Sequence, residues 1–226
     1  MSYPFAPTAQ RTREVWLETV SKVGSKVTPG NVQEATILAF KPLNKISTTT
    51  AVLLSTSDDL SVSPIQMLLP NLRLCQLFAM GLGICHVPVD ATGQTLWGNA
   101  RFVSDPEDAL FSAAEQAALR NIFNAKGTLK TGSTDRIDAL HTSEFQISSV
   151  NAPRFTTKCR LLCAVYTMVG GEKTQFELQM PDNSDLSALN DTATRKLFLV
   201  VKGMVINIVP DTSATRDEIA AAMRGK

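Results

Sequence analysis

The spacing of hydrophobic residues predicts a helix near each end of the chain. Residues 8–23 have the i, i+4, i+7 apolar spacing of an amphipathic helix, set by Trp16, Val20 and Val23. A similar apolar side predicts a last helix that begins near Thr212 or Ser213. Both helices are expected to pack one face against the core and leave the other in water.

A capping box predicts the start of a longer central helix. Ser104 and Glu107 are three residues apart, the spacing at which the two side chains satisfy two free backbone amides of a helix N-terminus. We expect this helix to run to about Ala125 and to end at Gly127. Residues 126–136 are polar and glycine-containing, which predicts a loop.

Between the helices, hydrophobic runs predict strands. The expected strands before the C-terminal third are 35–40, 46–56, 82–89, 96–103 and 144–150. Residues 64–80 are expected to hold one or two short helices instead, because Pro64 and Pro70 are each tolerated in a first helical turn.

The C-terminal part predicts two hairpins over residues 157–209. The first joins 157–169 to 174–180 through Gly170 and Gly171, since glycine supplies the positive φ of a tight turn. The second joins 196–201 to 204–209 through Lys202 and Gly203. The run from Leu197 to Val201 shows no alternation, which predicts a central strand buried on both faces.

Together these elements predict an α+β fold with about nine strands and four helices. The strands outnumber the helices and no βαβ rhythm repeats, so we expect an antiparallel-dominated sheet or a helix-decorated β-sandwich. No linker long enough to separate two domains is apparent, so residues 1–226 are expected to form a single domain.

Composition narrows the function classes. The chain has 226 residues, 44% of them hydrophobic and 19% charged, with a net charge of +1. This apolar content excludes an intrinsically disordered chain, and the near-zero charge excludes a strongly basic nucleic-acid-binding protein. Any contact with nucleic acid would have to use a local basic patch.

The sequence also indicates a cytoplasmic location. Residues 1–13 lack the apolar segment of a secretory signal, so Cys75, Cys85, Cys159 and Cys163 are expected to be reduced thiols. The nearly uncharged stretch 60–89 is interrupted by three prolines and two glycines, which favours buried core over a transmembrane segment.

Candidate catalytic and metal-binding groups are few. His86 and His141 are the two histidines, and a triad of Cys85, His141 and Asp90 has no support in its spacing. A zinc site would need long-range convergence of Cys75, Cys85, His86 and His141. We therefore expect no metal, no cofactor and no catalytic site, and a small hydrolase that uses Cys or Asp with His86 or His141 remains an alternative.

Two basic clusters are the candidate nucleic-acid-binding residues. One lies in the expected loop after the central helix and contains Lys126, Lys130 and Arg136. The other contains Arg154, Lys158 and Arg160, in a stretch without acidic residues; Lys158 and Arg160 share one strand face with Tyr166. A basic strand face with an aromatic residue can hold a phosphate backbone or stack a base. An ordinary solvated sheet face is the competing interpretation.

These observations favour a non-enzymatic, self-assembling structural protein, and we expect a viral coat or matrix protein with weak nucleic-acid contact. Sparse charge, many Ser and Thr residues and strand-rich segments suit wide contacts between subunits. The expected partners are further copies of the chain and single-stranded RNA, with the host cytoplasm and virion as the location. A viral movement or nucleic-acid-binding protein is the second hypothesis, and the small hydrolase is the third.

Overall fold

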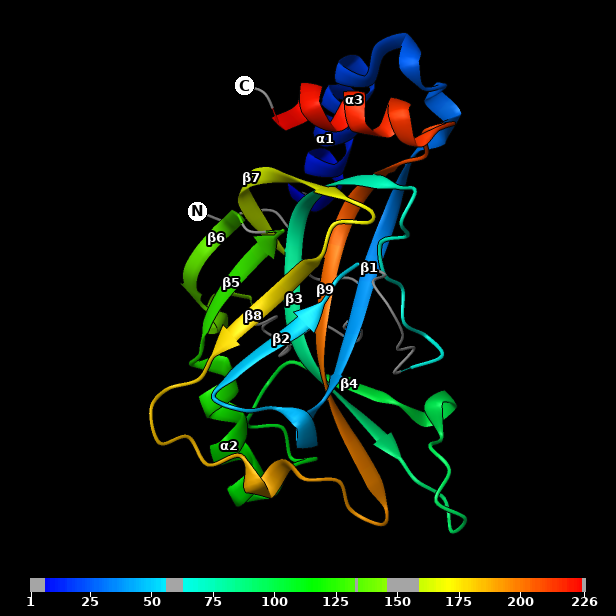
Figure 1. Cartoon of the computed structure of the whole chain (residues 1–226). Coiled ribbons are helices and arrows are strands. Elements are labelled where there is room, and N and C mark those ends of the chain that lie inside the picture. The colour runs from blue at the N-terminus through cyan, green and yellow to red at the C-terminus, as the bar shows by residue number, and fades with distance from the viewer. Residues whose placement is uncertain (1–6, 56–62, 133, 146–158, 225–226) are drawn as a thin grey trace.

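The computed structural model describes residues 7–55, 63–132, 134–145 and 159–224. These residues form an α+β fold with two antiparallel sheets, nine strands and three α-helices (Figure 1). The predicted fold class is therefore confirmed, with one helix fewer than expected in this described part of the chain.

Sheet A contains the longest strands. Its order is β1 (Val32–Pro42), β9 (Arg195–Ile208), β3 (Leu74–Pro88) and β4 (Arg101–Val103). A fifth strand, β7 (Arg160–Val169), also pairs with β3, and it covers the half of β3 that β4 leaves open. The three long strands β1, β9 and β3 thus lie side by side and make up most of sheet A.

Sheet B is smaller and crosses in front of the long strands in Figure 1. Its order is β2 (Thr49–Leu53), β8 (Thr174–Gln179), β5 (Lys126–Thr131) and β6 (Thr134–His141). We call the face of sheet A toward sheet B the inner face. Alternation along β8 is clear, because Phe176 and Leu178 are buried while Gln179 is exposed.

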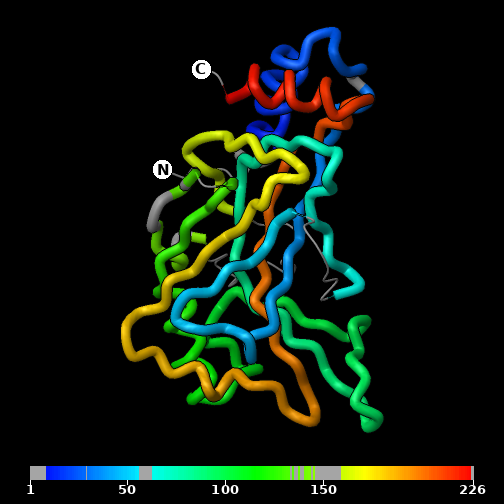
Figure 2. Tube along the Cα trace, viewed as in Figure 1, coloured from blue at the N-terminus to red at the C-terminus, as the bar shows by residue number. Residues whose placement is uncertain are grey.

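The helices cover different parts of sheet A. α1 (Pro7–Val23) and α3 (Ser213–Arg224) pack on its outer face at one end, where their apolar residues join those of β3 and β9. α2 (Ala113–Phe123) instead contributes to the core between the two sheets. Figure 2 shows the two ends of the described chain, in α1 and α3, at the same end of the molecule.

Burial on both faces of β9 confirms the predicted central strand. Leu197, Leu199 and Val201 enter the core between the sheets, whereas Phe198 and Val200 enter a separate cluster on the outer face. A strand with two apolar faces cannot alternate, which is why its sequence is a continuous hydrophobic run.

The expectation of helices in residues 64–80 is wrong. β3 begins at Leu74 and continues to Pro88 as one strand, with a register shift between Leu77 and Ala79. Nearly every residue of β3 is buried, because both faces of sheet A are covered along this strand. A strand buried on both faces has a continuous apolar run, and this run resembles that of a buried helix.

The central helix begins eight residues later than predicted. Its capping box is formed by Ser112 and Glu115: the Glu115 amide donates to Ser112 Oγ at 3.4 Å, and the Ser112 amide donates to Glu115 Oε2 at 2.6 Å. The same Ser-x-x-Glu spacing occurs at Ser104, but Glu107 binds Arg120 instead. Local spacing could not choose between the two boxes.

The loop predicted over residues 126–136 is a hairpin. β5 and β6 pair antiparallel around Gly132, whose φ is +59°. The helix has already ended at Phe123, and Gly127 lies inside β5 rather than at a helix terminus. The polar residues of this segment lie on the exposed face of a sheet. Polar residues are also typical of loops, which is why the sequence predicted a loop here.

Neither predicted C-terminal hairpin forms. β7 belongs to sheet A and β8 to sheet B, so Gly170 and Gly171 carry the chain from one sheet to the other. The second expected turn lies in the middle of β9, where Gly203 packs against Leu77; a Cβ there would be 2.8 Å from Leu77 Cδ1. Close packing, not a turn, accounts for this glycine.

The remaining boundaries differ modestly. β1 extends the strand expected at 35–40, β2 shortens the one expected at 46–56, and β4 retains only the end of 96–103. Residues 142–145 form a short 3₁₀ turn, and 146–150 of the expected strand 144–150 lie outside the described residues. The strand expected at 82–89 is the second half of β3.

Candidate functional site

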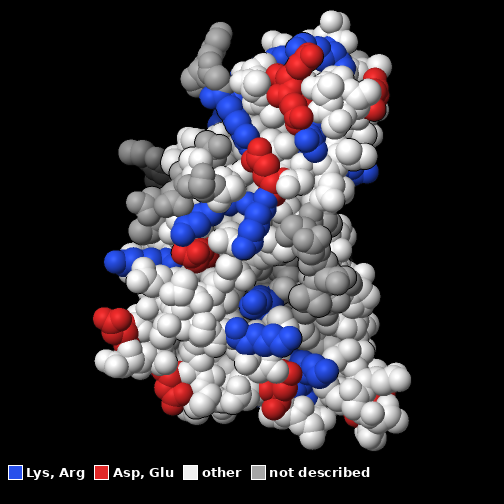
Figure 3. All heavy atoms as spheres, viewed as in Figure 1, with Lys and Arg blue, Asp and Glu red and all other residues white. Residues whose placement is uncertain are grey.

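Two of the three residues of the first basic cluster, Lys126 and Lys130, lie on the same strand. Lys126 and Lys130 point to the outer side of sheet B, Lys126 opposite His141 and Lys130 with its Nζ 2.8 Å from Glu177 Oε1. Figure 3 shows basic and acidic side chains interspersed on the visible face. Arg136 lies in the neighbouring edge strand β6.

The second basic cluster is separated from the first. Arg160 is the first residue of β7, in sheet A, while Arg154 and Lys158 lie outside the described residues. Tyr166 is half-buried and packs against the core between the sheets. The described basic residues therefore occupy two different sheets, and Tyr166 does not present an open stacking surface beside Arg160.

The structure does not bring the candidate triad together. Cys85 lies in an apolar cluster on the outer face of sheet A, where burial raises the pKa of its thiol to about 12. His141 is exposed in sheet B, which packs against the opposite face. A hydrogen bond from the Thr92 hydroxyl to Asp90, at 2.7 Å, lowers the pKa of that carboxyl within a turn.

The cysteines do not form a metal site either. In the part of the chain that the structure describes, no group of three His, Cys, Asp or Glu residues could hold a metal ion. Burial raises the pKa of the Cys75 thiol and raises that of Cys159 to about 11, whereas Cys163 is exposed.

The described helices include none that is long and apolar enough to cross a membrane.

A buried ion pair links α2 to the start of β9, and sequence reasoning missed it. Arg195 and Glu115 contact each other with side-chain exposures of 16% and 10%. His86 lies nearby on the inner face of β3, and its Nδ1 is buried without a hydrogen-bond partner. Burial, followed by the charge of Arg195 and then that of Arg101, lowers the pKa of His86. Nothing local in the sequence marks residues so far apart as neighbours.

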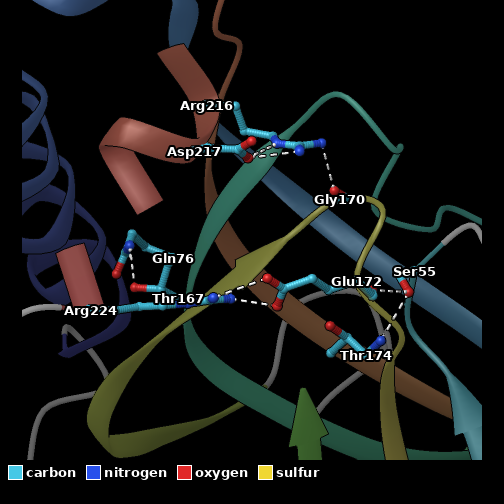
Figure 4. A network of polar contacts seen from close by, with 9 residues as sticks. All are labelled: Ser55, Gln76, Thr167, Gly170, Glu172, Thr174, Arg216, Asp217 and Arg224. Carbon is cyan, nitrogen blue, oxygen red and sulfur yellow. Dashed lines mark hydrogen bonds and ion pairs between the residues drawn. The ribbon is translucent and has the colours of Figure 1, made fainter. Parts of the chain in front are cut away.

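A second polar network fastens α3 to the crossing between the sheets (Figure 4). Arg216 donates to the carbonyls of Asn71 and Gly170 at 2.8 and 2.9 Å, and Arg224 makes two bonds to Glu172. The Ser55 hydroxyl donates to the Glu172 carbonyl at 3.0 Å. These polar groups are hydrogen-bond partners of one another, so we interpret the network as one that stabilises the fold.

The edge of β1 away from β9 is covered at two points. Leu38 exchanges both backbone hydrogen bonds with Met67, at 2.7 and 2.9 Å. Six residues earlier, Trp16 Nε1 of α1 donates to the Val32 carbonyl at 2.9 Å. Both contacts use backbone groups that point away from β9, and they define the two ends of an open segment.

Glu34 and Thr36 present the open backbone groups between these two points. In an antiparallel strand the N–H and C=O of alternate residues point to the same side, so residues 34 and 36 point outward like Val32 and Leu38. Both side chains are exposed, and no hydrogen bond from another described residue reaches these outward groups. We call this segment, from Val32 to Leu38, the β1 edge.

A groove of about 690 Å³ adjoins the β1 edge. It lies between α1 and the outer face of sheet A, and its lining residues are Ala9, Thr12, Arg13, Trp16, Val32, Gln33, Glu34, Met204 and Ile206. At the other end of the edge, Met67 is 55% exposed. The β1 edge thus combines unpaired backbone with apolar surface on both flanks, the features by which a sheet edge accepts an added strand.

Sequence reasoning did not identify this site, although it predicted β1 and α1. An exposed Glu34 and Thr36 are ordinary in a strand, and only the positions of Trp16 and Met67 show which part of the edge is open. No known protein family matches the sequence, and neither does any curated protein.

Proposed function

We propose that the chain is a non-enzymatic structural protein that assembles with copies of itself, of the kind found in viral coats or matrix layers, and that it contacts single-stranded RNA weakly. The β1 edge carries this proposal. Protein sheets commonly blunt their edges, because an unpaired edge strand is a template for pairing with another chain. Here the middle of the long edge strand of sheet A is uncovered by any other residue that the structure describes.

The chemistry of sheet B adds support. The outward positions of β5 and β8 carry Lys126, Thr128, Lys130, Gln175, Glu177 and Gln179. This face is rich in amide and hydroxyl groups and mixed in charge, which suits a wet contact between subunits. Its two lysines offer a small number of phosphate contacts, and such binding is weak and sensitive to salt.

Size-exclusion chromatography with light scattering tests both parts of the proposal. The purified chain is expected to form oligomers whose mass rises with concentration, and a fluorescent single-stranded oligonucleotide is expected to bind at low salt and dissociate as salt rises. A monomer at all concentrations up to the millimolar range would refute assembly. An unchanged oligonucleotide signal at low salt would refute the RNA contact alone.

A further inference from the structure

The length of the β1 edge limits what can bind there. Val32 and Leu38 are six residues apart, so the segment between the Trp16 and Met67 contacts is about 20 Å long. Two residues, Glu34 and Thr36, face outward within it. An added strand can therefore form about four backbone hydrogen bonds before it meets Trp16 or Met67.

A symmetric pairing of two β1 edges does not fit this segment. If Glu34 of one copy paired with Thr36 of another, Val32 of the first would lie opposite Leu38 of the second. Met67 already occupies the position beside Leu38. The contact at Met67 therefore favours a short extended segment over another complete β1 as the binding partner.

Residues 2–6 of the chain have the matching length and pattern. This segment, Ser-Tyr-Pro-Phe-Ala, lies outside the described residues and directly precedes α1. Five extended residues span about 17 Å, which is within the length of the β1 edge. Tyr3 and Phe5 are two apart, so in an extended strand their backbone groups would face the same side and meet Glu34 and Thr36.

Pro4 suits this arrangement. Proline has no backbone N–H and is accepted on an edge strand where its nitrogen faces solvent. With Tyr3 and Phe5 facing β1, Pro4 faces away from it and no hydrogen bond is lost. The two aromatic side chains would then share one sheet face.

That shared face matches the groove. Trp16 and Met204, both partly exposed, provide apolar contacts for two aromatic rings on the outer face of sheet A. Arg13 also lines the groove and is exposed, so it is placed to stack on an aromatic ring. The groove thus offers to Tyr3 and Phe5 the contacts that their side chains need.

A second copy of the chain is the better source of this segment than the same copy. Ala6 is bonded to Pro7, the first residue of α1, and the residue before a proline is held extended. Docking within one chain would place Phe5 in the added strand and leave only Ala6 for the turn into α1. Docking onto a neighbour requires no such turn.

We propose that the β1 edge and its groove bind residues 2–6 of a second copy, so that the segment before α1 of each subunit adds a strand to sheet A of the next. This inference rests on the self-assembly proposed above and names its contact.

Three variants of the full chain test the proposal by light scattering. In Thr36→Pro the outward N–H is removed while pairing with β9 is retained, because β9 bonds to the other side of β1. Tyr3→Ser with Phe5→Ser removes the aromatic side chains at unchanged length. Thr36→Ala, the matched control, keeps the N–H. We expect the proline variant and the double variant to raise the dissociation constant of the oligomer at least about tenfold, and the control to leave it within about twofold.

The outcomes separate this proposal from the function on which it rests. A monomeric unmodified chain would refute self-assembly itself. A chain that assembles, and assembles equally well in the proline and double variants, would refute the β1 edge contact and leave self-assembly standing. Circular dichroism of each variant checks that sheet A is intact.

A peptide titration provides a test independent of assembly. The receptor is the full chain with Tyr3→Ser, Phe5→Ser and Trp97→Phe, in which Trp16 is the remaining tryptophan. A synthetic peptide of residues 1–7 is expected to shift Trp16 fluorescence, and the same peptide with serine at both aromatic positions to bind at least about tenfold more weakly. No shift at millimolar native peptide, or equal binding of both peptides, would overturn the proposal.

Discussion

The ring of Phe176 in β8 lies over the backbone of Gly127 in β5. A Cβ at residue 127 would be 2.4 Å from Phe176 Cζ, and the Phe176 ring also makes an edge-to-face contact with Phe145. Sheet B and the core beneath it therefore require the absence of a side chain at this position.

Gly127→Ala is expected to destabilise the fold by about 1–3 kcal/mol, because the buried Phe176 ring would have to shift within the core. For a chain of this size the corresponding fall in melting temperature is about 2–4 °C per kcal/mol. Gly98→Ala is the control, since a Cβ at the exposed Gly98 meets nothing within 4 Å. Equal melting temperatures of the two variants in calorimetry would contradict this packing.

Removing one member of the buried ion pair should be costly. Glu115→Ala leaves Arg195 charged and largely buried, and it also removes the helix cap on Ser112, so we expect a loss of about 3–5 kcal/mol in urea unfolding. Glu107→Ala breaks a pair with Arg120 in which both side chains are about half exposed, and little change is expected. A double-mutant cycle with Arg195→Met would show coupling if the pair exists in solution.

Stability should fall in mildly acidic solution because of His86. Burial and the nearby arginines lower its pKa in the folded protein, so below about pH 6.5 the unfolded chain binds more protons than the folded one. This contribution to stability is complete above that pH and is lost as pH falls toward the folded-state pKa. Urea midpoints from pH 7.5 to 5 should show the decline, and His86→Asn should reduce it.

Thiol reactivity should distinguish the four cysteines. Cys163 is exposed, whereas burial raises the pKa of the Cys85 thiol to about 12 and that of Cys159 to about 11. A disulfide reagent at pH 8 should therefore modify one thiol quickly in the native chain and all four after denaturation. Cys163→Ser should abolish the fast phase; a fast phase that persists would contradict the placement of these side chains.

Binding of single-stranded RNA should depend on sheet B. Replacing Lys126 by Ala removes one charge from the outer face of β5 and should reduce the slope of log K against log salt by about 0.7. Fluorescence anisotropy at several salt concentrations measures this slope. Lys22→Ala, in α1 and paired with Glu18, is the control and should leave the slope unchanged.

Sequence reasoning succeeded where the pattern depends on burial of neighbouring residues. The α1 helix follows from its apolar spacing, and the central position of β9 follows from the run Leu197 to Val201. It failed where one local signal allowed two structures. Glycine at 127 and 203 indicated a helix end and a turn, yet both residues lie inside strands against a large side chain.

The candidate site could not be predicted from the sequence for a related reason. The sequence analysis selected basic residues, because charge is visible in a sequence. The β1 edge is defined instead by outward backbone groups of Glu34 and Thr36 that no other described residue bonds, and by Trp16 and Met67 at its ends. Any residue type can have a backbone N–H or C=O without a partner, so the sequence does not indicate where such groups lie.

By itself, the sequence determined the fold class, the two terminal helices and the double-sided burial of β9, since each depends on the period of apolar residues over a short stretch. Only the tertiary structure decided which of the two Ser-x-x-Glu boxes caps α2, that β7 and β8 belong to different sheets, and which part of β1 the other described residues leave open. These outcomes depend on contacts between residues far apart in the chain, and their free energies are not encoded in any local pattern.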